Sequence, residues 1–196
     1  MRLTELKAAQ ARLDWQAELL AHEPKPEAIP RSQLGQDLFV LLATSFMSEG
    51  YFVEFGAGNG IGLSNTWILE RSFGWNGIVA EPARGWHEQL RSTRHCVIDT
   101  RCVWEASGLE IPFAETSDPF LSSIREFAAT PEYAAQQRDA MTYPVETISL
   151  NDLLDEHSAP GRIDYMSVDT EGTELEILST FDFDRYEVRV LTVEHA

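Results

Sequence analysis

The sequence predicts an α/β protein whose mostly parallel sheet is covered by helices on both faces. Short segments rich in Val, Ile and Phe alternate with helical segments along most of the chain, and this order produces parallel strands joined by helices. The length of 196 residues and the hydrophobic content of 43% suit one domain with a buried core.

The first element is predicted to be a helix followed by a linker. Leu and Ala recur at three- and four-residue steps, as on one apolar helical face, at Leu3, Leu6, Ala9, Leu13, Ala17 and Leu20. This face would form a lid or a dimer contact, or would simply pack on the domain surface. Prolines 24, 26 and 30 then predict a linker, because each fixes φ and removes a backbone donor. Residues 1–30 are therefore assigned to the helix and linker, and residues 31–196 to the main domain.

The main domain is predicted to alternate strands and helices. Helical periodicity resumes at Asp37. Beyond it we expect strands at 51–55, 78–80, 96–98, 163–168 and 188–193, and helices at 64–73, 85–94, 131–141 and 150–157. Segment 104–115 indicates two extended pieces around Ser107 and Gly108. The pairs Ser149 with Asp152 and Thr173 with Glu176 have the spacing of helix-capping residues.

Composition argues against several classes of function. Thirty-two acidic and fifteen basic side chains give a formal charge of −17, which repels a nucleic-acid backbone. No apolar run is long enough to cross a bilayer, and the N-terminus lacks a basic cluster before an apolar block, so neither a membrane nor an export role is expected. Cys96 and Cys102 fit neither a disulfide framework nor a zinc site. We expect reduced thiols in a cytoplasmic protein.

Acidic residues close nearly every predicted strand. They are Glu54, Glu81, Asp99, Asp169 with Glu171, and Glu194 with His195. Ligands of parallel sheets bind beyond the carboxyl ends of the strands, so these side chains are expected to meet at one edge. Acids also favour helix N-termini, which would explain individual members. A ligand that presents several positive or hydroxyl groups explains the whole set more simply.

The glycines after the first main-domain strand do not match a dinucleotide site. Gly56, Gly58 and Gly60 are spaced G-x-G-x-G, and Ile61 stands where the third glycine of G-x-G-x-x-G belongs. Glu54 would repel a pyrophosphate but attract the ammonium and sulfonium groups of S-adenosylmethionine. Gly56 and Gly58 would let the backbone approach the methionine moiety. Glu81, after the next strand, would accept hydrogen bonds from both ribose hydroxyls.

Several motifs resemble the FkbM-type branch of S-adenosylmethionine-dependent methyltransferases. They are "SQLGQD", "FVEFGAGNGIGLSNT", "GIVAEP", "TISLNDLL" and "IDYMSVDTEGTELEIL", of which the D-x-E-G-x-E-L-E-x-L run is the most specific. The resemblance runs from about Ser32 to the end. It implies the class I, Rossmann-like methyltransferase fold and methyl transfer to an oxygen, often a hydroxyl of a sugar or natural product.

The resemblance also implies roles for individual residues. Cofactor contacts would come from Glu54, Gly56, Gly58, Asn59, Glu81, Pro82, Asp169 and, through main-chain groups around the adenine, Arg101. Asp169 and Glu171 match the family's acidic motif beside the transferred methyl group. Gln33 and Asp37 would help to close the pocket over the substrate, although an ordinary helix start capped by Ser32 explains the same motif equally well.

The C-terminal end departs from the class I pattern. In these enzymes the fifth strand is followed by a helix and an antiparallel strand pair, whereas this sequence stops at "TVEHA". We therefore expect a C-terminally truncated domain that lacks the last strands of the usual seven. Its unpaired edge would favour association, so an impaired or homodimeric form is expected unless the N-terminal helix shields that edge.

Methyl transfer to a hydroxyl requires a group that accepts the hydroxyl proton. His195, Asp169 and Glu171 are the candidates, and His195 has the most suitable ordinary pKa, although a packed strand-end histidine explains it as well. Asp169, Glu171, Glu194 and His195 would alternatively gather a divalent cation such as magnesium. Carboxylate clusters at surfaces usually bind only water, so no metal is expected.

The acceptor is expected to be a small-molecule hydroxyl compound. Segment 118–124 lies where these folds carry substrate loops, so Ser122 and Ser123 would line a polar acceptor site beside Phe120, unless the segment is an ordinary surface loop. An NAD-dependent oxidoreductase would need the missing glycine and a Tyr–Lys relay, and no lysine follows Lys25. A non-catalytic binding or scaffold protein with a methyltransferase-like fold is the remaining alternative.

Overall fold

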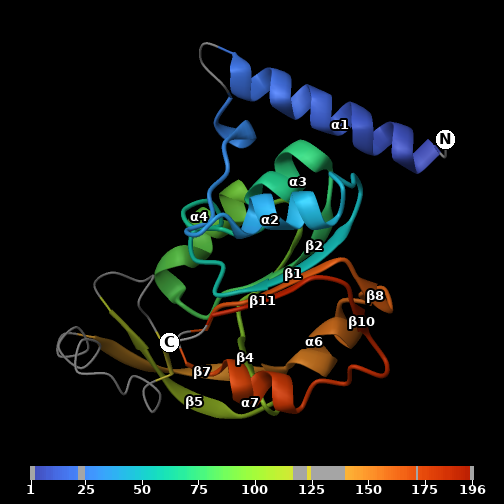
Figure 1. Ribbon diagram of the computed structural model, residues 1–196. Coiled ribbons are helices and arrows are strands. Elements are labelled where there is room, and N and C mark those ends of the chain that lie inside the picture. The colour runs from blue at the N-terminus through green and yellow to red at the C-terminus, as the bar shows by residue number, and fades with distance from the viewer. Residues whose placement is uncertain (1–2, 22–24, 117–122, 125–139, 171, 195–196) are drawn as a thin grey trace.

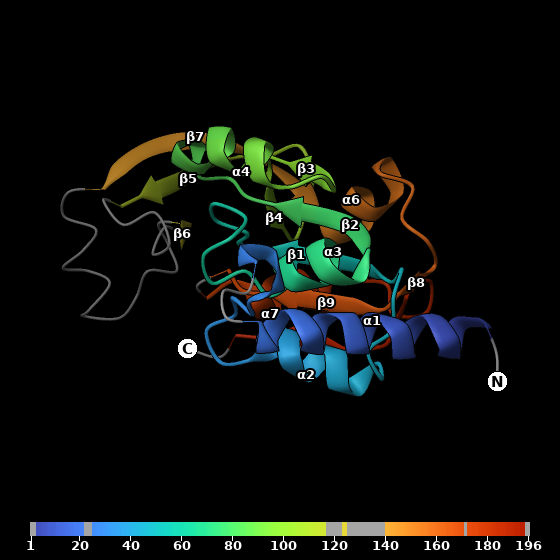
Figure 2. The same cartoon turned by 90° about the horizontal axis from the view of Figure 1, so that it is seen from above.

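A parallel five-stranded sheet forms the centre of the protein, as the sequence predicts. The computed structural model describes residues 3–21, 25–116, 123–124, 140–170 and 172–194. The strand order is β11-β9-β1-β2-β3, and every neighbouring pair is parallel. The strands are β1 (Tyr51–Phe55), β2 (Asn76–Ala80), β3 (Val97–Asp99), β9 (Tyr165–Val168) and β11 (Leu191–Val193). Their carboxyl ends therefore meet at one edge of the sheet (Figures 1 and 2).

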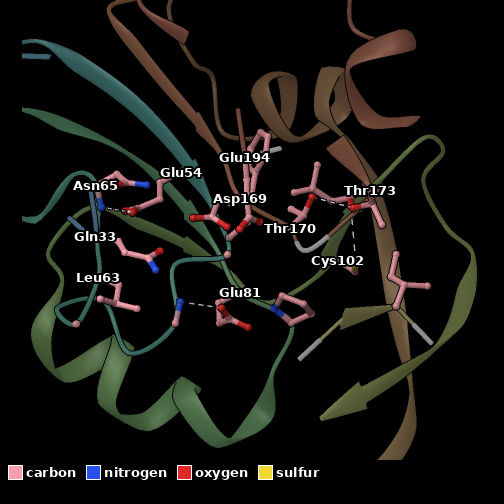
Figure 3. A pocket seen from close by; sticks show the side chains of 18 of the residues that line it. Gln33, Glu54, Leu63, Asn65, Glu81, Cys102, Asp169, Thr170, Thr173 and Glu194 are labelled. Atoms are coloured by element: carbon pink, nitrogen blue, oxygen red, sulfur yellow. Dashed lines mark hydrogen bonds between the residues drawn. The ribbon is translucent and has the colours of Figure 1, made fainter. Parts of the chain in front are cut away.

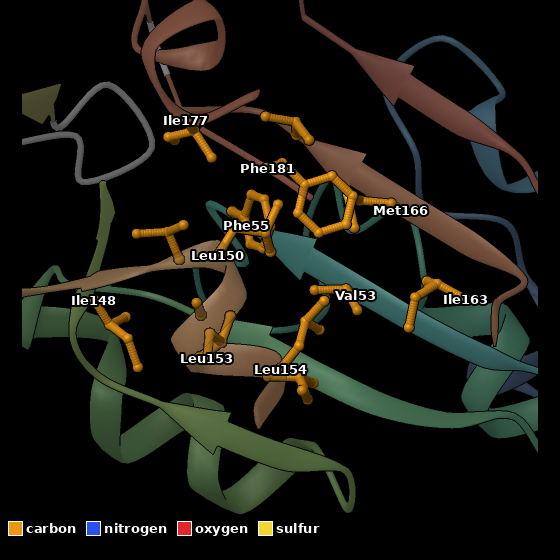
Figure 4. Close-up of a cluster of buried hydrophobic side chains, with 14 of the residues drawn as sticks. Val53, Phe55, Ile148, Leu150, Leu153, Leu154, Ile163, Met166, Ile177 and Phe181 are labelled. Carbon is orange, nitrogen blue, oxygen red and sulfur yellow. The ribbon is translucent and has the colours of Figure 1, made fainter. Parts of the chain in front are cut away.

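Helices cover both faces of this sheet. On one face lie α1 (Leu3–Leu20), the short helix η1 (Pro26–Ala28), α2 (Gln36–Ala43), α3 (Trp67–Phe73), the short helix η2 (Arg84–Trp86) and α4 (His87–Thr93). On the other lie α6 (Leu150–Glu156) and α7 (Glu174–Ser179). Side chains alternate along β1, so that Phe52 packs with the first group, whereas Val53 and Phe55 pack with the second (Figure 4). Burial on both faces explains why the strands read as continuous apolar runs.

Helix α1 exists as predicted, but it packs through a different face. Trp15 is buried, and its ring centroid lies 5.8 Å from that of Phe46 and 6.0 Å from that of Phe73. Its indole N–H donates to the Ala28 carbonyl at 2.9 Å. The leucines that defined the predicted face, at positions 3, 6, 13 and 20, are exposed. The helix therefore has a second apolar stripe that faces away from the domain.

A second sheet, which the sequence analysis resolved only in part, lies beside the main one. Its order is β4-β7-β5-β6, with β4 (Cys102–Trp104), β5 (Glu110–Glu115), β6 (Ser123–Ile124) and β7 (Met141–Ser149). Of the two extended pieces predicted within 104–115, the second is confirmed as β5, whereas β4 ends at Trp104 and overlaps the first at that residue alone. Strand β7 was missed, and Met141, assigned to a helix, is its first residue. Residues 131–139 of that predicted helix lie outside the described residues.

Two of the predicted strands are each divided in the structure. Segment 163–168 becomes β8 (Arg162–Ile163) and β9, and segment 188–193 becomes β10 (Glu187–Val188) and β11; β8 and β10 pair separately in parallel. Asp164 marks the first division, because its carboxylate accepts from the Tyr51 N–H at 3.1 Å. The predicted cap of α6 is confirmed, since the Ser149 side chain accepts from the Asp152 N–H.

Within the described residues, no helix combines the length and apolar character needed to span a membrane.

Candidate functional site

A pocket opens at the carboxyl ends of the central strands. It encloses about 970 Å³, including solvent at its mouth. Polar and acidic side chains contribute much of its lining, as Figure 3 shows: Gln33, Gln36, Glu54, Asn65, Glu81, Asp169, Thr170, Thr173 and Glu194. The sequence analysis placed strand-end acids at this edge, and four of them, Glu54, Glu81, Asp169 and Glu194, line the pocket. Of the other two, Asp99 does not line it, and Glu171 lies outside the described residues.

Gly56 is required by the packing of two strands. Its φ is +71°, and a Cβ added there would lie 1.9 Å from the Asp169 carbonyl oxygen. From the sequence, Gly56 is expected to let a ligand approach the backbone. The structure provides a nearer reason, because only a residue without a side chain lets the end of β1 pass the end of β9 this closely.

Glu81 is held by two backbone N–H groups on the pocket floor. Its carboxylate accepts from the Gly58 and Ala83 N–H groups, each at 2.7 Å. Burial raises its pKa to about 7, although both N–H donors favour the ionised form. The side chain is 6% exposed and belongs to the pocket lining. The carboxylate therefore has a fixed orientation, and it would bind a ligand that donates further hydrogen bonds to it.

Glu54 already has a full set of partners within the chain. It accepts from the Asn65 N–H at 2.7 Å and from the hydroxyls of Ser64 and Thr66. The Arg94 guanidinium lies 3.3 Å away, and both side chains are almost completely buried. The sequence predicts a cationic ligand for Glu54 and gives no sign of its pairing with Arg94. In the structure Arg94 supplies the opposing charge, and Glu54 organises the turn that begins α3.

The ends of β9 and β11 carry the other two acids of the pocket. Val168 is in register with Val193, so Asp169 and Glu194 follow neighbouring strand ends. The loop after Asp169 is tied back by Glu174, whose carboxylate accepts from the N–H and hydroxyl of Thr170, each at 3.0 Å. Thr173 makes no side-chain cap hydrogen bond, so the predicted pairing of Thr173 with Glu176 is wrong. Glu174 stabilises this loop instead, through its hydrogen bonds to Thr170.

The second sheet supplies an apolar wall opposite this acidic side. Its contributors are Cys102, Val103, Phe113 and Ile124. Burial raises the pKa of the Cys102 thiol to about 12, so this thiol stays neutral and acts as a small apolar group. The wall is fastened to the loop after β2, because the Tyr143 hydroxyl donates to Glu115 and accepts from the Arg84 N–H at 3.0 Å.

Three residues predicted to contact ligands are not among the residues that line the pocket, and their side chains bond within the chain. The Asn59 amide oxygen accepts from the N–H groups of residues 61 and 62, which closes the glycine turn. Asp37 is buried in the first turn of α2 and accepts from Ser32 and from the Arg31 N–H, whereas the N-cap position belongs to Gly35 and not to Ser32. Arg101 pairs with Asp99 and Glu156.

Asp99 is likewise occupied within the chain. Burial opposes its ionisation, but hydrogen bonds from Arg101 and His157 outweigh this effect and hold the Asp99 pKa below its ordinary value.

Gln33 and Pro82 lie in the pocket lining as expected. Ser122, Glu171 and His195 lie outside the described residues, and of Ser123 only the backbone, in β6, is described. Within the described part of the chain, no three His, Cys, Asp or Glu side chains lie close enough together to hold a metal ion.

Sequence reasoning missed several lining residues, including Asn65, Thr170 and the apolar wall. For Asn65 a signal existed, because "SNT" follows the glycine turn directly and precedes α3. The wall gave no such signal, because its members come from strands of a sheet that forms only in the folded chain.

Comparison with known proteins identifies the family. A family model described as the methyltransferase FkbM domain matches residues 3–196. The chain belongs to this family. Neither the curated proteins nor the solved structures gave a match. The resemblance carried by "SQLGQD" and the acidic run is thereby confirmed, and FkbM membership agrees with the parallel strand order, so the fold is that of a class I methyltransferase.

Proposed function

We propose that this FkbM protein is an S-adenosylmethionine-dependent methyltransferase that methylates an oxygen of a small-molecule acceptor, a hydroxyl of a sugar or natural product. The observation that carries the proposal is the charge of the pocket. Four carboxylates line it. Arg94, which is not a lining residue, compensates the charge of one of them, Glu54, and none of the described lining residues is Lys, Arg or His. Such a pocket disfavours a pyrophosphate and suits a ligand that is cationic and free of phosphate.

The lining residues fit such a donor from end to end. Glu81 would accept hydrogen bonds from the ribose hydroxyls, because its carboxylate is already aligned by Gly58 and Ala83. The wall that contains Cys102 and Phe113 would cover the adenine. Asn65 and Asp169 line the polar part of the pocket, where the amino-acid end of the donor would lie.

The bound cofactor would supply an electrophilic methyl group, and the chain would position the acceptor oxygen and exclude water. Asp169 is the described side chain best placed to accept the hydroxyl proton, because it follows β9 at the pocket rim. Glu171 and His195 remain candidates for the same role. We expect Asp169→Asn to preserve the free energy of unfolding and to abolish methyl transfer. A normal rate would remove Asp169 from the catalytic set.

Titration calorimetry with S-adenosylmethionine, S-adenosylhomocysteine and NAD tests the proposal. We expect one site that binds both sulfur nucleosides and not NAD. Preference for NAD would contradict a methyltransferase, and binding of none of the three would favour the alternative of a scaffold with this fold. Mass spectrometry of the native host's small molecules, with and without the protein and S-adenosylmethionine, would then identify the methylated acceptor.

We also propose a cytoplasmic location and self-association into a homodimer. Both cysteines are free, which is compatible with a reducing compartment. Among the described strands, β11 pairs only with β9, so its other edge is open to a second copy. Light scattering during gel filtration tests the dimer, since a monomer at all concentrations would contradict it.

A further inference from the structure

Two hydrogen-bond acceptors in the pocket have no partner within the described chain. They are Asn65 Oδ1 and Glu194 Oε2, and both atoms are buried. A buried polar atom without a partner costs about 1–3 kcal/mol, so native proteins rarely keep one without a reason. Because both atoms are acceptors in one pocket, they indicate a ligand that carries hydrogen-bond donors.

Asn65 is held so that its amide oxygen remains available. Its Nδ2 donates to Ser167 Oγ at 2.9 Å, and its backbone N–H donates to Glu54 at 2.7 Å. The residue is 4% exposed. The two acceptors belong to neighbouring strands, β9 and β1, so that the first bond fixes the side chain of Asn65 and the second fixes its backbone. The oxygen is thus a prepared acceptor at low conformational cost.

Glu54, the acid beside Asn65, is not equally available. Arg94 compensates its charge, and Ser64 and Thr66 occupy its oxygens. The ion pair therefore acts as a support that positions the Ser64–Thr66 turn and, through it, Asn65. Arg94 is itself fixed by a second buried carboxylate, Glu70.

The surroundings of Asn65 favour a positively charged donor. Figure 3 shows Asn65 and Gln33 on one side of the pocket and Cys102 on the other, with Asp169 and Glu81 between them. Of these two acids, Glu81 is assigned to the ribose, so Asp169 is the one that favours an ammonium group over a hydroxyl at this end of the pocket. The apolar side with Cys102 offers no comparable partner.

We propose that Asn65 Oδ1 accepts a hydrogen bond from the α-ammonium group of the methyl donor, so that Asn65 selects ligands with an intact amino-acid end. The assignment rests on the proposed function of the pocket. It makes Asn65, rather than the strand residue Glu54, the direct contact, and it gives Glu54 and Arg94 the role of positioning residues.

A pair of ligands and one variant test this assignment. S-adenosylhomocysteine carries the amino-acid end, whereas 5′-methylthioadenosine has the same nucleoside and sulfur without it. Asn65→Leu keeps a side chain of similar size and removes the acceptor. We expect the variant to bind S-adenosylhomocysteine at least about tenfold more weakly and 5′-methylthioadenosine within about twofold of wild type by calorimetry. Equal weakening of both, or of neither, would overturn the assignment.

A second measurement needs no variant and therefore does not depend on whether Asn65→Leu folds. The wild-type protein should bind an S-adenosylhomocysteine analogue without the α-amino group at least about tenfold more weakly than the parent compound. Equal affinity for the two would refute the contact while leaving the proposed function intact. A wild-type protein that binds neither S-adenosylhomocysteine nor 5′-methylthioadenosine would instead overturn the proposed function, and the assignment with it.

Discussion

Lowering the pH from 8 to 6 should weaken the binding of S-adenosylhomocysteine about tenfold. Burial raises the pKa of Glu81 to about 7, so the free protein holds a proton on this carboxylate over much of that range. Ribose hydroxyls donate to the ionised form, and ligand binding must therefore expel the proton. The carboxylate cannot move away to avoid this, because Gly58 and Ala83 hold both of its oxygens.

The magnitude follows from the fraction of free protein in which Glu81 is ionised. With a pKa of about 7, that fraction is about nine tenths at pH 8, one half at pH 7 and one tenth at pH 6. The affinity ratio between pH 8 and pH 6 is the ratio of these fractions, about tenfold or 1.4 kcal/mol. At pH 7 about half a proton should be released for each ligand bound.

Titration calorimetry across this range, in two buffers with different ionisation enthalpies, measures both quantities. Glu81→Gln is the matched control, because it keeps the shape of the side chain and cannot ionise. His87, whose ring contacts the Glu81 carbonyl oxygen, has a pKa lowered by burial, and it remains in the control. A flat profile for wild type, or the same slope in the variant, would refute the assignment of Glu81 to the ribose.

Three further predictions concern stability. The pKa of Glu81 is raised from its ordinary 4.5 to about 7, so the contribution of Glu81 to the free energy of unfolding is complete at low pH and is lost, by up to about 3 kcal/mol, as the pH rises through 7. The Tm of the ligand-free wild type should therefore fall further between pH 5 and pH 8 than the Tm of Glu81→Gln. Parallel Tm curves for the two proteins would contradict this. Arg94→Met should cost about 3–5 kcal/mol in urea unfolding, against less than about 0.5 for the exposed control Arg91→Met, and equal costs would show that the buried pair is unimportant. Gly56→Ala should cost about 3 kcal/mol or more because its Cβ would overlap a backbone oxygen, whereas Gly74→Ala, with φ of +66° and open space, should cost about 1; similar costs would refute the packing argument.

Local signals in the sequence were sufficient for the central sheet. Alternation of apolar runs with helical segments predicted a mostly parallel sheet, and Ser149 predicted the start of α6 correctly. The acids that line the pocket were also predicted, because the carboxyl ends of parallel strands must meet. For two of them, Glu81 and Asp169, the proposed function keeps the roles predicted from the sequence.

The predictions from the sequence were wrong where contacts between segments distant in the chain determine the structure. Strand β7 exists because it pairs antiparallel with β5, where Ile111 opposes Val145, and no local pattern reveals such a partner. Helix α1 was predicted from its leucines, yet it packs through Trp15, because the complementary surface around Phe46 lies elsewhere in the chain. Hydrophobic periodicity identifies a helix but does not decide which of two apolar stripes is buried.

The charge balance of the site could not be read from the sequence for the same reason. Glu54 and Arg94 are 40 residues apart, and only the packing of α4 against the glycine turn brings them together. An acid that faces a buried arginine supports its neighbours, whereas an unpaired acid attracts a cation. Because Arg94 compensates the charge of Glu54, the unpartnered amide oxygen of Asn65 becomes the proposed ligand contact.

A crystal structure of the chain with S-adenosylhomocysteine tests the central claim most directly. Our account predicts the nucleoside in the pocket at the strand ends, with both ribose hydroxyls on Glu81, the base against Phe113, and the amino-acid end between Asn65 and Asp169. A ligand bound outside this pocket, or one whose base lies at Asn65 with its ribose away from Glu81, would contradict it.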